Sequence, residues 1–167
     1  VPYIGGISGR TNSQYMIEDQ RFASQRPDVL TFTTETLQED LTLSGPIAAS
    51  LYVSTTGSDA DFIVKIIDEL PDTTSNLRSN LSYIQMGGFQ RLLRAEVMRG
   101  KFRNSLEDPE PFVPGVISKV NIKLNDVAHT IKKGHKLVVQ VQSSWFPLVD
   151  RNPQKFMKIW NAKKTDF

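Results

Sequence analysis

Apolar and polar residues alternate with a period of two in several short segments of this chain. The clearest are residues 47–54, 120–125 and 136–141, where Ile, Leu, Val or Ala fills every second position. Because side chains of an extended strand point alternately to its two faces, each segment is predicted to be a strand with one buried face. Residues 61–67 (DFIVKII) are apolar on both faces, which is typical of a central strand.

Other segments extend this β pattern. Residues 29–34 are rich in β-branched and aromatic side chains, and residues 41–43 form a short alternation that we expect to end at Gly45-Pro46. Residues 92–98 fit a strand by their spacing and a helix by their composition. Turn-forming residues separate the segments, as at Gly57-Ser58-Asp59, Gly87-Gly88 and Pro114-Gly115. Seven or eight short strands with turns between them predict an all-β sandwich or barrel.

The chain has 167 residues, which is typical of one domain. No window shows a clean helical stripe, and the two helix candidates, within residues 15–24 and 153–160, are short. The ends of the chain are irregular and differ from the alternating middle. We therefore expect an N-terminal arm over residues 1–27 and a single β domain over residues 28–167. The first residue is Val1 and not Met, which suggests a piece of a longer protein.

Composition excludes several classes of protein. Twenty Lys and Arg against eighteen Asp and Glu give a net charge of +2, and the charges are mixed along the chain, so nucleic acid is not an expected partner. There is no cysteine, which excludes disulfides, thiol nucleophiles and cysteine-ligated zinc. No apolar run approaches the ~20 residues of a membrane span, so no membrane partner is expected. The sequence does not identify the cellular compartment of the protein.

The motifs that carry chemistry elsewhere are weak in this chain. Gly6-Ile7-Ser8-Gly9-Arg10 lacks the last glycine of the nucleophile elbow G-x-S-x-G. His129 and His135 are accompanied by no oxyanion loop, and we interpret them as structural residues near a turn. Asp59 and Asp61 have a chemistry that suits calcium, but they flank a turn, where Asp is common for other reasons. We therefore expect no catalytic residue, no metal site and no cofactor in this chain.

Several segments taken together resemble one protein family. They are DQRFASQRPDVL at 19–30, LTLSGP at 41–46 with DADFIVK at 59–65, RAEVMRGKFRNS at 94–105, IKKGHKL at 131–137, and SSWFP with DRN within 143–152. In this order they resemble the C-terminal non-catalytic domain of the X-prolyl dipeptidyl-peptidase and cocaine-esterase group of serine hydrolases. Residues 94–105 and 143–152 are most similar to α-amino-acid ester hydrolases and glutaryl-7-aminocephalosporanic-acid acylases. The resemblance covers roughly residues 1–152.

The resemblance implies a jelly-roll β-sandwich, similar to galactose-binding modules, that packs against an α/β-hydrolase domain of the same parent chain. It implies that the parent cleaves esters, amides or X-Pro peptide bonds with a Ser-Asp-His triad located upstream. This chain is then not itself an enzyme; it braces the catalytic domain and shapes the active-site region, and homo-oligomerisation is left open. The expected contacts with the hydrolase domain are Asp19, Arg21, Arg26, Asp28, Trp145, Phe146, Asp150, Arg151 and Asn152.

Two other functions compete with this interpretation. A carbohydrate-binding module has the same sandwich architecture, with Trp145 as the ring that stacks on a sugar. A calcium-stabilised adhesion domain would use Asp59 and Asp61. The family's sequence normally continues beyond the last strands, whereas this chain stops at Phe167. Because a sandwich separated from its neighbouring domain exposes an apolar face, we also expect a tendency to self-associate.

Overall fold

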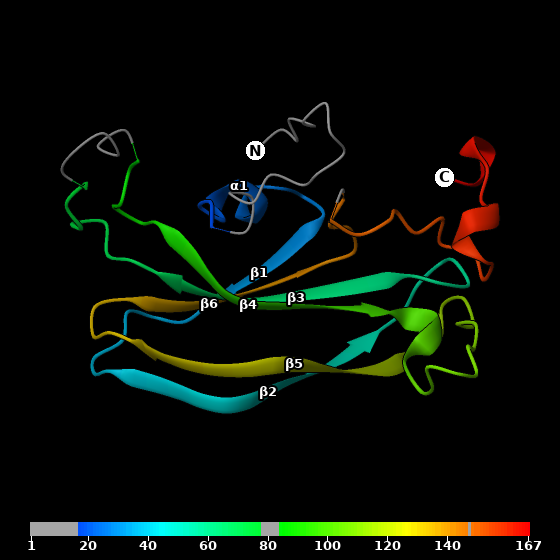
Figure 1. Ribbon diagram of the computed structural model, residues 1–167, viewed down its shortest axis with the longest axis horizontal. Helices are drawn as coiled ribbons and strands as arrows, with labels where there is room; N and C mark the ends of the chain where they lie inside the picture. The colour runs from blue at the N-terminus through cyan, green and yellow to red at the C-terminus, as the bar shows by residue number, and fades with distance from the viewer. Residues whose placement is uncertain (1–16, 78–83, 147) are drawn as a thin grey trace.

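Six β-strands in two antiparallel sheets form the body of the part of the chain that the structure describes (Figure 1). The structure is a computed structural model, and it describes residues 17–77, 84–146 and 148–167. The strands are β1 (Val29–Thr33), β2 (Leu41–Val53), β3 (Asp61–Glu69), β4 (Gln90–Arg99), β5 (Ser118–Ile131) and β6 (Lys136–Gln142). The helices are α1 (Arg21–Ser24) and the 3-10 helices η2 (Gly100–Phe102), η3 (Ile159–Asn161) and η4 (Lys164–Asp166).

The two sheets form the layers of a sandwich. One sheet has four strands in the order β1-β6-β3-β4, and the other pairs β2 with β5. In Figure 1 the β2-β5 layer lies below the four-stranded layer, and β5 approaches β4 where the layers meet. The predicted all-β sandwich is thus confirmed, and residues 61–67 are in β3, which has a strand on each side.

The main core lies between the two sheets. The buried residues Val120, Ile122 and Leu124 of β5 face Val64 and Ile66 of β3. Partly buried residues of β2 complete this layer, and they are every second residue of the strand apart from the bulge: Leu43, Ile47, Ala49, Leu51 and Val53. In β2 and β5 the period of two therefore corresponds to one buried face, because burial of apolar surface is the main stabilising term of folding. The single buried face predicted for residues 136–141 is wrong: Gln140 and Gln142, on the face opposite Val139 and Val141, are buried in β6.

The opposite face of the four-stranded sheet is also covered. Ile63, Ile67 and Val138 are buried there, and α1 and the chain that follows β6 lie over this face in Figure 1. Lys65 occupies the centre of the same face, where the register pairs it with Gln140 on one side and Ala95 on the other. This second covered face explains why the sequence of β3 is apolar on both sides.

Strand β2 runs through the position where the sequence predicts a break. It continues from Leu41 to Val53, so the expected end at Gly45-Pro46 is wrong. The register against β5 shifts between Gly45 and Ile47, and Gly45 has a φ of 95°, a conformation that glycine adopts without steric penalty. This bulge accommodates Pro46, which has no N–H to donate to the ladder.

The ambiguous segment and the two helix candidates have different outcomes. Residues 92–98 lie within β4, because hydrogen bonds to β3 decide in favour of the strand. The helix candidate within residues 15–24 is confirmed over Arg21–Ser24, and residues 15 and 16 lie outside the described residues. The candidate within 153–160 is wrong apart from the start of η3: Gln154 has a φ of 59°, which interrupts a helix. Within the described ranges no helix is long and apolar enough to cross a membrane.

Candidate functional site

The C-terminal segment, defined here as residues 148–167, closes the end of the sandwich where β3 begins and β4 ends. Asp61 and Arg99 are direct partners in the β3-β4 ladder. Arg99 Nε lies 3.3 Å from Asp61 Oδ1, and Asn152 of the C-terminal segment donates a hydrogen bond of 2.7 Å to the same oxygen. Burial raises the pKa of the Asp61 carboxyl above its ordinary value, and the contacts with Asn152 and Arg99 oppose this rise.

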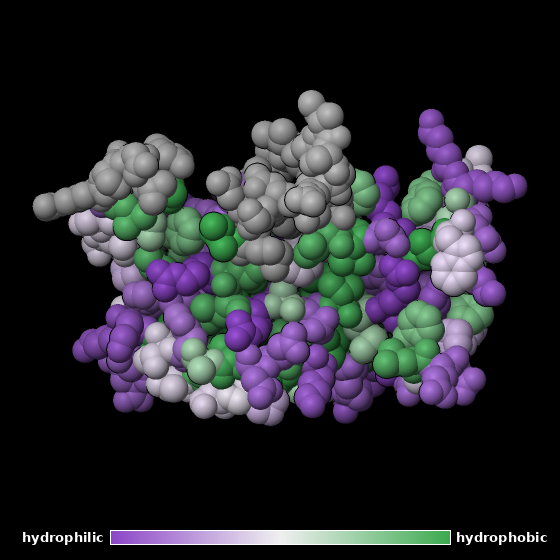
Figure 2. Space-filling view, in the orientation of Figure 1, coloured by the Kyte–Doolittle hydropathy of each residue, from purple (hydrophilic) through white to green (hydrophobic). Residues whose placement is uncertain are grey.

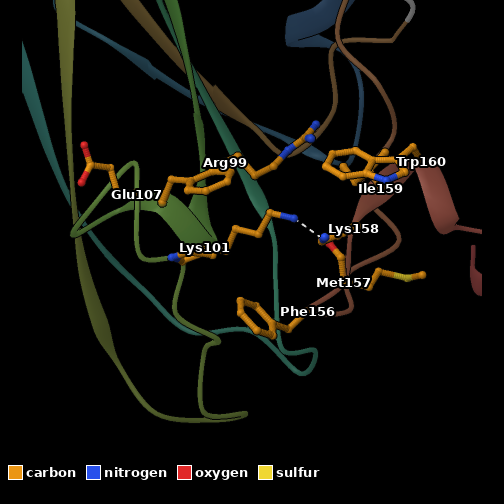
Figure 3. Close-up of a pocket in the computed structure, with 10 residues that line it drawn as sticks. Arg99, Lys101, Glu107, Phe156, Met157, Lys158, Ile159 and Trp160 are labelled. Atoms are coloured by element: carbon orange, nitrogen blue, oxygen red, sulfur yellow. Dashed lines mark hydrogen bonds between the residues drawn. The ribbon is translucent and has the colours of Figure 1, made fainter.

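A second charged pair lies beside the first. Asp59 Oδ1 accepts hydrogen bonds from the backbone N–H groups of Ala60 (2.9 Å) and Lys101 (3.0 Å). Lys101 Nζ donates to the carbonyl of Met157 at 2.6 Å, the bond drawn in Figure 3, and lies 3.9 Å from Asp59 Oδ2. Asp59 and Asp61 thus face basic side chains of the protein. The described residues contain no group of three or more His, Cys, Asp or Glu side chains arranged to hold a metal ion.

Backbone hydrogen bonds attach the C-terminal segment to the loop before β3. The carbonyl of Gln154 accepts the N–H groups of Ser58 (3.0 Å) and Asp59 (3.3 Å), and the N–H of Phe156 donates to Ser58 Oγ at 2.8 Å. Gly57 is required for this approach, since a Cβ at that position would lie 2.3 Å from the Gln154 carbonyl oxygen. The C-terminal segment is therefore a fixed part of the domain.

Two neighbouring cavities that lie along the C-terminal segment share part of their walls. The first has a volume of about 400 Å³ and lies between η2 and the C-terminal segment; its walls include Phe102, Phe156 and Trp160 (Figure 3). The second has a volume of about 500 Å³ and shares Arg99, Ile159 and Trp160 with the first. Phe146, Asp150, Arg151 and Phe167 also line the second cavity.

The residues predicted to contact a hydrolase domain fall into distinct environments. Phe146 is 56% exposed, and it lines the second cavity with the exposed residues Asp150 and Arg151, so the structure brings these three together. The guanidinium of Arg151 lies 5.4 Å from the centre of the Phe167 ring. Asn152 binds Asp61. Trp145 is only 6% exposed, so its ring is not available as a platform for a sugar.

The charged residues of the N-terminal arm bind mainly to each other and to the backbone. Arg21 Nε donates to Asp19 Oδ2 at 2.6 Å, and its guanidinium also donates to the carbonyls of Gly87 (2.9 Å) and Gln85 (3.2 Å). Arg26 and Asp28 form an ion pair at the surface, and hydrogen bonding from Arg26 lowers the pKa of the Asp28 carboxyl.

The two histidines share one carboxylate that the sequence did not indicate. Asp68 is buried in β3, and its two oxygens lie 2.9 Å from His129 Nε2 and 2.7 Å from His135 Nδ1. The guanidinium of Arg91 lies 4.0 Å away. Because His129 is in β5 and Asp68 in β3, this cluster connects the two sheets. Asp126, the acid closest to His129 in sequence, is not its partner.

Comparison with known proteins shows the family. Residues 10–165 match the family described as the X-Pro dipeptidyl-peptidase C-terminal non-catalytic domain. The chain is 32% identical over 152 residues to a cocaine esterase of Rhodococcus sp. (strain MB1 Bresler), a match that covers 91% of this chain and 24% of the esterase.

Solved structures agree with this match. An aminopeptidase of the marine sediment archaeon Thaumarchaeota archaeon is 43% identical, with a TM-score of 0.81. An α-amino acid ester hydrolase is 41% identical, also with a TM-score of 0.81. Both matches cover 90% of this chain and 24% of the other chain, so this chain spans about a quarter of the length of its relatives. The resemblance inferred from the sequence motifs is confirmed, and this chain belongs to the family of X-Pro dipeptidyl-peptidase C-terminal non-catalytic domains.

Proposed function

We propose that this chain is the accessory domain of a larger serine hydrolase, that it braces the catalytic domain, and that it forms part of the wall of the active-site region. The observation that carries the proposal is the match of residues 10–165 to a non-catalytic domain family, together with relatives that are about four times longer and are named as hydrolases. The parent's reaction is then hydrolysis of an ester, an amide or an X-Pro peptide bond.

The surface of the chain supports a docking role. The C-terminal segment exposes large apolar side chains, among them Trp160 (80% exposed), Phe156 and Phe167. Figure 2 shows hydrophobic side chains at the surface of the end of the molecule where this segment lies. Large apolar side chains exposed among polar ones are typical of a surface that a partner covers.

The predicted contact residues divide into two roles in this proposal. Phe146, Asp150 and Arg151 are exposed together and contact the catalytic domain directly, as does the surface pair Arg26 and Asp28. The other predicted residues have partners inside the domain, and they position the arm and the C-terminal segment: Asp19, Arg21, Trp145 and Asn152. Ion pairs between arginine and carboxylate groups across the boundary would fix the relative orientation of the domains.

The test compares the hydrolase that contains this chain with the same enzyme lacking it. We expect the shortened enzyme to melt at a lower temperature and to lose kcat/KM on an aminoacyl or p-nitrophenyl ester. Addition of the 167-residue chain should restore part of both. Unchanged stability and activity in the shortened enzyme would show that the domain does not brace it. Ester hydrolysis by the 167-residue chain alone would contradict the non-catalytic role.

A further inference from the structure

The first cavity has the size and the lining of a small-molecule site. Its volume of about 400 Å³ lies within the range of about 300–1,000 Å³ that is typical of ligand pockets. A cavity of about 150 Å³ in another protein already accommodates benzene, so this one has room for an aromatic ring with a substituent.

The walls of this cavity are mainly apolar. Phe102 comes from η2, while Phe156, Met157, Ile159 and Trp160 come from the C-terminal segment. Figure 3 shows the Trp160 ring at one end of the cavity and Glu107 at the opposite end. The aromatic rings and the Met157 thioether that line the cavity favour a ligand whose apolar part is about the size of one aromatic ring.

The two ends of the cavity differ in charge: basic side chains lie at the end with Trp160, and Glu107 lies at the opposite end. Arg99 and Lys158 line it with Trp160, and Lys158 Nζ lies 5.8 Å from the centre of the Trp160 ring. Arg99 directs Nε and one terminal nitrogen to Asp61, which leaves N–H groups without a hydrogen-bond acceptor among the described residues. Among the residues that the structure describes, none forms an ion pair with Lys158. The Lys101 ammonium is already engaged inside the domain, where it donates to the Met157 carbonyl and lies 3.9 Å from Asp59 Oδ2.

We propose that this cavity binds a small carboxylate with an apolar body, whose ring or short chain packs against Phe102, Phe156 and Trp160 and whose carboxylate pairs with Arg99 and Lys158. Glu107 at the other end repels an anion, so the ligand enters with its carboxylate toward Trp160. Ester and amide hydrolysis releases carboxylic acids of this class, and the suggestion that the ligand is such a product rests on the proposed function. The binding site itself does not depend on it.

The test is an NMR titration of the 15N-labelled 167-residue chain with sodium phenylacetate, with phenylacetamide as the uncharged analogue. We expect saturable shifts in the indole N–H of Trp160 and in the backbone amides of residues 156–160, with a Kd on the order of 1 mM for so small a ligand. Phenylacetamide should bind about tenfold more weakly, because it lacks the charge-assisted hydrogen bonds.

Two variants with matched controls identify the site. Lys158→Gln should weaken phenylacetate binding about tenfold, whereas Lys119→Gln should not; Lys119 also lies over an aromatic ring, 6.0 Å from the centre of Tyr52, but on the other layer. Trp160→Ala should weaken binding, and Tyr52→Ala, which removes an aromatic ring that is 74% exposed, should not. For each variant, unchanged spectra away from the substituted residue and its immediate neighbours establish that the protein is folded.

Several outcomes would overturn the proposal. The absence of saturable shifts means that the cavity binds no such ligand. Equal binding of phenylacetate and phenylacetamide means an apolar cavity without anion recognition. Shifts in the same amides that depend on protein concentration, without any ligand, mean that a second copy of the chain covers the cavity. Because the titration uses no catalytic domain, any of these results leaves the bracing role to be judged by its own experiment.

Discussion

The ammonium group of Lys65 lies 4.9 Å from the centre of the Trp145 ring, inside the layer that covers the four-stranded sheet. It also lies 5.6 Å from the centre of the Phe22 ring and donates a hydrogen bond of 2.9 Å to Gln20 Oε1. Lys65 is 0% exposed, and no carboxylate of the described residues forms an ion pair with it. A single buried cation thus connects the central strand to the N-terminal arm and to the chain after β6 through aromatic rings and a neutral amide.

The first prediction concerns the pH dependence of stability. Burial lowers the pKa of Lys65 to about 8 from an ordinary value of 10.5. Between these two values the unfolded chain binds the proton more tightly than the folded chain, so this group makes the protein more stable as pH rises through that window. At about 1.4 kcal/mol for each pKa unit, the full effect is about 3 kcal/mol.

Lys65→Met tests this prediction, because methionine fills similar space without the charge. The free energy of unfolding is measured in urea for both proteins between pH 7.5 and pH 10.5, and the difference between them cancels the contributions of other titrating groups. We expect the stability of Lys65→Met relative to the wild type to fall by about 3 kcal/mol over this range. A difference that does not change with pH would show that Lys65 titrates in the folded protein as it does in the unfolded chain.

The cluster around Asp68 is predicted to hold the two sheets together. Asp68→Ala removes the acceptor for His129 and His135 and leaves both ring nitrogens without their partner. We expect a loss of about 2–3 kcal/mol in the free energy of unfolding. Asp126→Ala is the control, since Asp126 is exposed on β5 and no side-chain hydrogen bond of the described residues involves its carboxylate. Equal losses in the two variants would argue against a special role for the cluster.

The attachment of the C-terminal segment is predicted to depend on Gly57. The Cβ of Gly57→Ala would lie 2.3 Å from the Gln154 carbonyl oxygen, so the C-terminal segment must move. We expect faster hydrogen exchange at the amides of Ser58, Asp59 and Phe156 and a stability loss of about 1–3 kcal/mol. The neighbouring exposed substitution Thr56→Ala should leave these rates unchanged. Unchanged exchange in Gly57→Ala would mean that the two segments do not approach so closely.

The edge strand β1 is predicted to cause self-association of the chain. Leu30 and Phe32 point to the side of the four-stranded sheet that carries the main core, yet they remain 62% and 60% exposed. An exposed edge strand with apolar side chains is a site for association between copies. We expect the double variant Leu30→Thr and Phe32→Thr to have a lower average mass in sedimentation experiments at high concentration. The same average mass for variant and wild type would place the association elsewhere.

Local pattern was a good guide to the strands and a poor guide to their ends. The alternation of apolar residues located β2, β5 and β6, because residues that face the main core recur with a period of two, and a run that is apolar on both faces located β3. The predicted break at Gly45-Pro46 failed because a bulge allows both residues to remain in a strand that pairs with β5. The segment 92–98 was ambiguous until the pairing of β4 with β3 was known.

The functional residues likewise divide into those that the sequence indicated and those whose partners only the structure revealed. The segments around Arg99 and Arg151 carried the family's motifs, so the sequence identified the family without any knowledge of contacts. The partner of the histidines was not visible in the sequence, because Asp68 lies 61 residues from His129 and 67 from His135 along the chain. Lys65 gave one signal, a lone lysine in an apolar strand, which did not reveal the rings that surround it.

The sequence alone determined that this chain is a β-sandwich of one family, since periodicity and motifs are local properties that survive without coordinates. Only the tertiary structure decided which face of each sheet is covered, that Trp145 is buried while Trp160 is exposed, and that Arg99 lines two cavities. The physical reason is that burial, ion pairing and cavity formation depend on segments distant in the chain, and their meeting is set by the packing of the whole domain.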